Sequence, residues 1–146
     1  MEQRFDVTQL IPEGYRAMYA LHAYVQGAGL DLGLLELVRL RVSQTNGCGF
    51  CVAMHIPLAR KHGVSEHQIN LVATWKESPV FSARERVALA WADAVTSLAG
   101  QEVSDAVYEQ VKAEFSAEEI AKLTLCIGEI NTWNRLMIAS RTPPTL

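Results

Sequence analysis

The sequence predicts an all-α fold of about six to seven helices. No stretch shows the period-two alternation of apolar and polar residues that is typical of a half-buried strand. Three segments instead carry a capping box, in which a serine begins a helix and a Gln or Glu three residues later bonds back to it. These pairs are Ser65 with Gln68, Ser82 with Glu85, and Ser116 with Glu119. Glycines and a Pro143-Pro144 pair add stop signals.

Seven helices follow from these signals. Three begin at the capping boxes, Asn46-Gly47 separates two apolar segments, and Gly63 and Gly100 each end a helix. The expected ranges are 13–28, 31–45, 48–62, 65–75, 82–99, 104–114 and 117–139. The segment 31–45 is apolar almost all the way round its helical wheel, which is the pattern of a buried helix.

Length and composition indicate one domain. The chain has 146 residues, of which 49% are apolar, and this is enough for one core. No repeat, low-complexity tract or long linker divides it, so we expect a single domain over 1–146 with its core at about 13–140. Several helices are apolar on more than one face, which predicts an oligomer.

Charge and hydropathy exclude some partners. Lys and Arg number 13 against 16 Asp and Glu, without a basic run, so nucleic acid is not an expected partner. The N-terminus lacks an apolar signal core, and no apolar run approaches the roughly 18 residues of a membrane span. We therefore expect a soluble cytoplasmic protein without membrane contact. Three cysteines in such a chain favour reactive or metal-binding thiols over a structural disulfide.

The segment from Cys48 to His55, with its second thiol at Cys51, is the strongest functional signal in the chain. On a helix, positions 48, 51 and 55 lie on one face. Two thiols and an imidazole on one face predict redox chemistry through a transient disulfide between Cys48 and Cys51.

Glu36 lies in the apolar segment 31–45, upstream of the two cysteines. We expect one of two environments for it. It forms an ion pair with Arg39, three residues further on, or it is partly desolvated with a raised pKa that suits proton transfer near neutral pH. The residue types alone leave both alternatives open.

Electrostatics and distance favour different sulfurs as the attacking thiolate. Cys48 opens the predicted helix, where free amides and the helix dipole stabilise a thiolate. Cys51 is about 6 Å along the axis from His55, whereas Cys48 is about 10.5 Å away, at the usual rise per residue. On distance we assign attack to Cys51, deprotonated by His55 directly or through water, and resolution to the more exposed Cys48. The reverse assignment stays open.

Three other interpretations of the two cysteines compete with the redox one. A structural zinc site needs four ligands; the motif supplies three, and His62 or His67 would have to be the fourth on a helix interrupted by Pro57. Cysteines that only pack are the second interpretation, but the start of a helix after Asn46-Gly47 is a poor place for inert filling. A thioredoxin domain is the third, and it lacks the required strands. We expect no metal.

The remaining candidate residues are expected to be structural. Cys126 lies in an apolar run of the last helix and is expected to be a small buried residue. Trp91 and Trp133 sit at helical spacing with other apolar residues, as core or subunit-contact residues do. His22 and His67 have no acidic or thiol neighbour in sequence and stay unassigned.

The spacing of Glu36, eleven intervening positions, Cys48-x-x-Cys51, three more positions and His55 resembles the signature of the alkylhydroperoxidase D-like proteins. These belong to the carboxymuconolactone decarboxylase superfamily. The resemblance is specific from about residue 34 to residue 63 and continues more weakly through residues 131–135. It implies an all-helical domain that forms homotrimers or homohexamers, and a thiol peroxidase or disulfide reductase cycle without heme, flavin or metal.

The same resemblance implies roles for the four residues. Cys51 would attack peroxide, Cys48 would resolve the product, and Glu36 with His55 would relay protons. The chain departs from the best-known members at one position, since Phe50 stands where they have a further histidine. The resemblance therefore implies a proton relay with one group fewer.

We therefore expect an enzyme that reduces alkyl or hydrogen peroxide with electrons from a thiol or protein donor and needs no cofactor. The first alternative is a non-redox lyase of the decarboxylase kind, in which His55 and Glu36 perform acid–base chemistry and the thiols are spectators. The second is a non-catalytic sensor whose disulfide changes its assembly.

Overall fold

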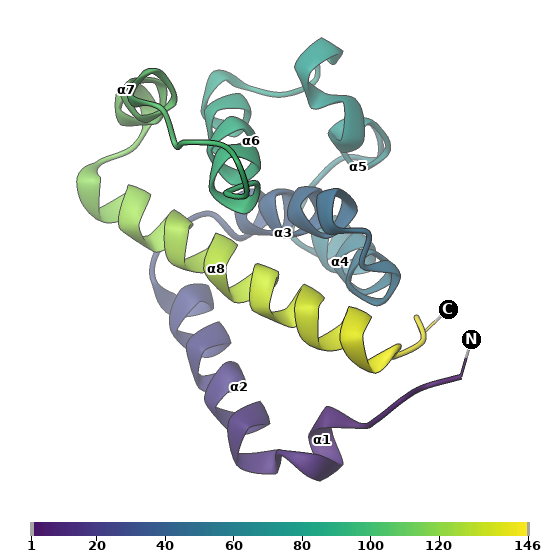
Figure 1. The fold of residues 1–146 in the computed structure, drawn as a ribbon. Helices are drawn as coiled ribbons and strands as arrows, with labels where there is room; N and C mark the ends of the chain where they lie inside the picture. The colour runs from purple at the N-terminus through teal and green to yellow at the C-terminus, as the bar shows by residue number, and fades with distance from the viewer. Residues whose placement is uncertain (1, 146) are drawn as a thin grey trace.

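The computed structural model describes residues 2–145, and every regular element within them is helical (Figure 1). The predicted all-α class is therefore confirmed. The α-helices are α1 (Val7–Leu10), α2 (Pro12–Gly27), α3 (Leu32–Asn46), α4 (Gly49–Lys61), α5 (Glu66–Leu71), α6 (Ala83–Thr96), α7 (Asp105–Glu114) and α8 (Ala117–Ser140), with a 3₁₀ helix η1 (Val72–Glu77) after α5.

Helix α3 forms the centre of the molecule. It packs against α4, α6 and α8, and most of its side chains are buried on all sides, as its apolar wheel predicts. One apolar cluster fills the space between α3, α6 and α8, and a second lies where α3 meets η1 and α6. Because α3 is fixed on three sides, polar residues on it are held rigidly.

Helix α8 crosses the whole molecule in Figure 1, with α2 on one side and α3 with α4 on the other. The N-terminal segment returns to its far end, where the Arg4 amide donates to the Ser140 carbonyl at 2.8 Å. The two ends of the chain consequently lie near each other (Figure 1).

The three predicted capping boxes are all present, at Ser65, Ser82 and Ser116, and in each one both reciprocal bonds form. Four further helix starts are capped by side chains that the capping-box pattern does not detect, and two of these caps are at α3 and α7. Asp31 accepts from the Leu34 amide at the start of α3, and Ser104 accepts from the Val107 amide at the start of α7.

The structure differs from the predicted elements in two places. The segment expected as one helix over 65–75 divides into α5 and η1, with non-helical backbone angles at Thr74, and Arg86 donates to the carbonyls of Trp75, Lys76 and Ser78 where η1 ends. The short α1 before Pro12 was not expected. Residues 2–145 thus contain eight α-helices and one 3₁₀ helix rather than six to seven helices.

No helix within residues 2–145 combines the length and apolar composition that crossing a membrane requires.

Candidate active site

The turn from α3 to α4 positions the first thiol. Gly47 adopts φ 72°, a left-handed conformation that suits glycine, and the Cys48 amide donates back to the Ser43 carbonyl at 2.9 Å. Cys48 is therefore the N-cap of α4, and its Sγ accepts a hydrogen bond from the Cys51 amide at 3.4 Å. The predicted position of Cys48 at a helix start is confirmed.

The two thiols differ in acidity. The Cys51 thiol donates to the Cys48 sulfur. Together with the Cys51 amide and Asn134, this thiol outweighs burial and lowers the pKa of Cys48 to about 7. The neighbouring Cys48 thiolate and burial raise the pKa of Cys51. The dithiol therefore carries its negative charge on Cys48, as the helix-start argument predicts. Both cysteines are free and buried, so the expected exposure of Cys48 is wrong for its side chain.

Asn134 of α8 is a site residue that the sequence did not single out individually. Its side chain is fully buried, donates to the Ser43 hydroxyl at 3.1 Å and accepts from the Asn46 amide at 2.9 Å. It also lowers the pKa of Cys48. Asn134 thus links α8 to the thiol end of α4.

Glu36 lies between two cationic or protonatable partners. Its Oε2 accepts from His55 Nδ1 at 2.7 Å, and its Oε1 accepts from Arg39 Nη1 at 2.8 Å. Burial alone would raise the pKa of Glu36, but His55 and Arg39 outweigh burial and lower it. The expected ion pair with Arg39 is therefore confirmed, and the alternative of a raised pKa is wrong.

His55 has one nitrogen engaged and one free. Because ionised Glu36 only accepts, Nδ1 of His55 donates to it, and Nε2 is buried without a hydrogen-bond partner among the described residues. No hydrogen bond within residues 2–145 joins His55 to Cys51. Direct proton transfer between them is therefore not seen, and transfer through water stays a prediction.

Arg39 connects this group to a second histidine that the sequence left unassigned. Its Nη2 donates to Glu129 Oε2 at 3.1 Å, and Glu129 Oε1 accepts from His22 Nδ1 at 2.6 Å. Burial opposes ionisation of Glu129, yet His22 and Arg39 lower its pKa. No sequence signal could join His22 to Glu129, since α2 and α8 are far apart in the chain.

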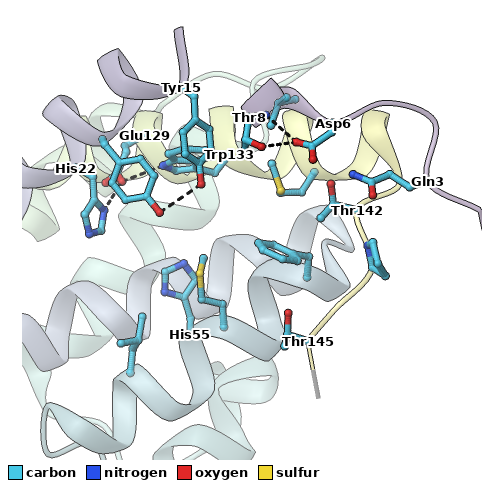
Figure 2. A pocket seen from close by; sticks show the side chains of 17 residues that line it. Gln3, Asp6, Thr8, Tyr15, His22, His55, Glu129, Trp133, Thr142 and Thr145 are labelled. Atoms are coloured by element: carbon cyan, nitrogen blue, oxygen red, sulfur yellow. Dashed lines mark hydrogen bonds and ion pairs between the residues drawn. The ribbon is translucent and has the colours of Figure 1, made fainter. Parts of the chain in front are cut away.

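Both histidines line one cavity of about 540 Å³ below α2 and α8 (Figure 2). Aromatic and sulfur-containing side chains form much of its wall. Its lining includes Val7, Tyr15, Tyr19, His22, Phe50, Met54, His55, Leu58, Glu129, Trp133 and Met137. Neither Cys48 nor Cys51 lines it.

Cys48 instead lines a second cavity of about 320 Å³, which the segment Arg141–Pro144 partly covers. Phe50, Met137, Thr142 and Pro143 line both cavities and so belong to the wall between them. Phe50 is therefore one of the residues that separate the cavity that holds His55 from the cavity that holds Cys48.

The ligands of the alternative structural zinc site do not come together among the described residues. Among residues 2–145, no group of three or more His, Cys, Asp or Glu side chains is placed to hold a metal ion. Cys126 is fully buried, and burial raises its pKa to about 12, as expected of a packed cysteine. Trp91 is buried in the core, whereas Trp133 is half-buried and donates to Glu129 at the cavity wall.

Comparison with known proteins gives one family and close structural relatives. A model of the carboxymuconolactone decarboxylase family matches residues 12–94. The uncharacterized protein YdfG of Bacillus subtilis is 35% identical over 139 residues, which are 95% of each chain. The uncharacterized protein YnjA of Escherichia coli is 36% identical over 115 residues, 78% of this chain and 62% of its own.

Two solved structures share the fold. A protein of unknown function from Agrobacterium tumefaciens, described as a candidate antioxidant defence protein AhpD, has a TM-score of 0.97 and 43% identity, with 99% of both chains covered. An uncharacterized peroxidase-related protein from Ralstonia eutropha with an AhpD core has a TM-score of 0.85 and 22% identity, covering 95% of this chain and 74% of its own.

Proposed function

The chain belongs to the carboxymuconolactone decarboxylase family, with an AhpD-like fold, and from this premise we propose that it is a thiol-dependent peroxidase. It reduces organic or hydrogen peroxide through a redox-active disulfide between Cys48 and Cys51. A thiol or protein donor then reduces the disulfide. The observation that carries the proposal is a pair of free cysteines at a helix start, in which Cys48 Sγ accepts a hydrogen bond from the Cys51 amide at 3.4 Å.

The proposed cycle begins with the dithiol as a monoanion. The Cys48 thiolate takes the proton of the Cys51 thiol, and the Cys51 sulfur attacks the terminal peroxide oxygen, which breaks the O–O bond. Cys51 becomes a sulfenic acid and the alkoxide takes a proton from the His55 imidazolium, which releases the alcohol. The Cys48 thiol then displaces hydroxide from the sulfenic acid, and its proton completes the water.

Glu36 has a supporting role in this cycle. Because it is ionised and bonded to Nδ1 of His55, it fixes the orientation of the ring at the wall of the larger cavity and supports its role as a proton donor. Arg39 keeps Glu36 ionised in a buried setting. The apolar lining of the cavity favours an alkyl over a very polar hydroperoxide.

The roles of the two sulfurs are tested by adding cumene hydroperoxide to reduced protein and counting free thiols. In Cys51→Ser, peroxide should cause no thiol loss. In Cys48→Ser, Cys51 should be trapped as a sulfenic acid by dimedone. Thiol loss at the wild-type rate in Cys51→Ser would show that Cys48 attacks and would refute the assigned order.

A second candidate function rests on the larger cavity. Two carboxylate-bound histidines line it and no cysteine does, which also suits a non-redox lyase or isomerase that acts on an organic acid or lactone. The Cys48/Cys51 double serine variant distinguishes the two functions. A lyase would keep its full activity in this variant, whereas the peroxidase would lose all of it.

A further inference from the structure

His22 and His55 are the two ends of one hydrogen-bonded chain of side chains. From His22 the chain passes through Glu129, Arg39 and Glu36 to His55, with successive distances of 2.6, 3.1, 2.8 and 2.7 Å. Each imidazole uses Nδ1 to bind its carboxylate. Three helices besides α4 contribute to the chain, since His22 lies on α2, Arg39 on α3 and Glu129 on α8.

His22 and His55, the two end residues of this hydrogen-bonded series, both line the larger cavity. Figure 2 shows His22 and His55 projecting toward the same space from α2 and α4. His55 is 3% exposed, and its Nε2 has no hydrogen-bond partner in the described part of the chain. A buried imidazole nitrogen without a partner costs free energy unless a bound molecule satisfies it. Nε2 of His22 likewise forms no hydrogen bond with any residue from 2 to 145.

Arg39 couples the two ends electrostatically but does not conduct protons. A guanidinium is not deprotonated in proteins, so a proton cannot pass from Glu129 to Glu36 through it. Two ionised carboxylates and one guanidinium leave the buried group one negative charge. Each carboxylate is also bonded to an imidazole, so both histidines adjoin this charge.

An aromatic wall continues from this pair of histidines. Tyr15, Tyr19 and Trp133 lie edge to face or tilted, with ring centroids 5.0 to 5.7 Å apart, and all three line the cavity. Met54 and Phe50 line it from α4. Rings and thioethers pack well against a flat aromatic group.

We propose that the larger cavity binds a hydroperoxide with an aromatic body, and that His22 is a second catalytic histidine there, because two carboxylate-bound imidazoles joined through Arg39 line one apolar cavity. The inference rests on the proposed peroxidase function for the chemistry of the head group. His22 accepts a hydrogen bond from the O–H of the hydroperoxide and orients the O–O bond. His55 supplies the proton to the oxygen that leaves as alcohol. The ring of the substrate lies against Tyr15 and Trp133.

The first test measures binding without turnover. Cumyl alcohol, the product of cumene hydroperoxide, is titrated into the wild-type protein while imidazole NMR signals are followed, with His22→Gln and His55→Gln used to assign them. We expect the signals of His22 and His55 to shift with one shared Kd while those of His62 and His67 stay in place. An unshifted His22 signal, or shifts that do not saturate, would overturn the proposal.

The second test separates the aromatic body from the head group. Tert-butyl alcohol has the same hydroxyl but no ring, and it should bind about 10-fold more weakly because it loses the aromatic contacts. His22→Gln should lower kcat/KM for cumene hydroperoxide about 10-fold, the size of one lost hydrogen bond, whereas the exposed His67→Gln should not change it. Equal binding of the two alcohols would contradict an aromatic site.

These tests separate the inference from the function on which it rests. If cumyl alcohol shifts both imidazoles but no peroxide is consumed, the binding site stands and the peroxidase proposal fails. If peroxide is consumed normally in His22→Gln and the alcohol leaves His22 unshifted, the peroxidase stands and the role of His22 fails.

Discussion

Cys48 owes its acidity to four donors around one sulfur: the Cys51 thiol, the Cys51 amide, Asn134 and the Phe50 amide. Its alkylation by iodoacetamide should therefore rise with pH with a midpoint of about 7, since the thiolate is the nucleophile. Cys126 should stay unmodified in the folded protein, because it is fully buried with a pKa of about 12. Peptide mapping by mass spectrometry measures both sites. A midpoint near 9, the ordinary value of a thiol, would contradict the structure.

Asn134→Ala tests the third donor. Removing the side-chain amide should raise the midpoint for Cys48 above about 7, because the thiolate loses a hydrogen bond. Asn131→Ala is the matched control, since Asn131 lies on the same helix and bonds to Asn46 and Thr96 rather than to a cysteine. The same shift in both variants would show that α8 packing, and not the Asn134 amide, sets the acidity.

At the residue scale, the sequence predicted the members of the site that lie close together along the chain. Cys48 and Cys51 share one turn, and Glu36 meets His55 because α3 and α4 are joined by the short Gly47 turn. The contact between His22 and Glu129 was not predicted, since only the packing of α2 on α8 brings these residues together. The pKa of Glu36 also needed the structure, because its direction depends on two partners that act against burial.

At the scale of elements, Arg39 joins α3 to α8 through two buried carboxylates. Arg39→Met should lower the free energy of unfolding by about 3–5 kcal/mol, because Glu36 and Glu129 would stay buried without their cation. Urea unfolding at neutral pH measures the change. Arg60→Met, which removes an exposed ion pair with Glu66, is the control and should have little effect. Equal stability of Arg39→Met and wild type would contradict the assigned role of Arg39.

Helix α4 carries the wall between the two cavities. Because Phe50 lines both of them, Phe50→Ala should join the His55 cavity to the Cys48 cavity and accelerate the loss of thiols with cumene hydroperoxide several-fold. Stopped-flow measurement with excess peroxide gives the rate, and Met54→Ala, which enlarges only the His55 cavity, is the control. A slower reaction in Phe50→Ala would show that Phe50 positions the substrate rather than obstructing it.

Elements with local start signals were predicted well. The capping boxes located α5, α6 and α8 because the serine and its partner lie within one turn. The end of η1 could not be predicted from local signals, since there Arg86 of α6 reaches the carbonyls of Trp75 and Lys76. Local signals thus fix where helices begin, whereas contacts between helices decide where some of them end.

At the scale of the whole molecule, exposed apolar residues gather on the N-terminal helices. Leu10, Tyr19 and Tyr24 are 68%, 53% and 58% exposed, beside the half-exposed Ile11. We propose that this surface is covered in a homotrimer or homohexamer. Sedimentation velocity should then give three or six times the 16.2 kDa chain mass. A sedimenting species of one chain mass across micromolar concentrations would contradict this prediction.

The all-α class of the fold could be predicted because the chain lacks any period-two segment and its central helix is apolar on every side. The arrangement of α2 and α8 around α3 was not predictable, since it depends on which helix faces pack against each other. That arrangement creates the larger cavity and its second histidine. Sequence therefore predicted the redox motif, and the assembled molecule added the proposed substrate site.

The disulfide between Cys48 and Cys51 is the step on which the proposed function depends. The most direct measurement treats reduced protein with one equivalent of cumene hydroperoxide and maps the cysteines by mass spectrometry under non-reducing conditions. The account predicts one Cys48–Cys51 crosslink with Cys126 still free, and loss of the crosslink on addition of dithiothreitol. Three free thiols after the peroxide is spent, or a crosslink that involves Cys126, would contradict it.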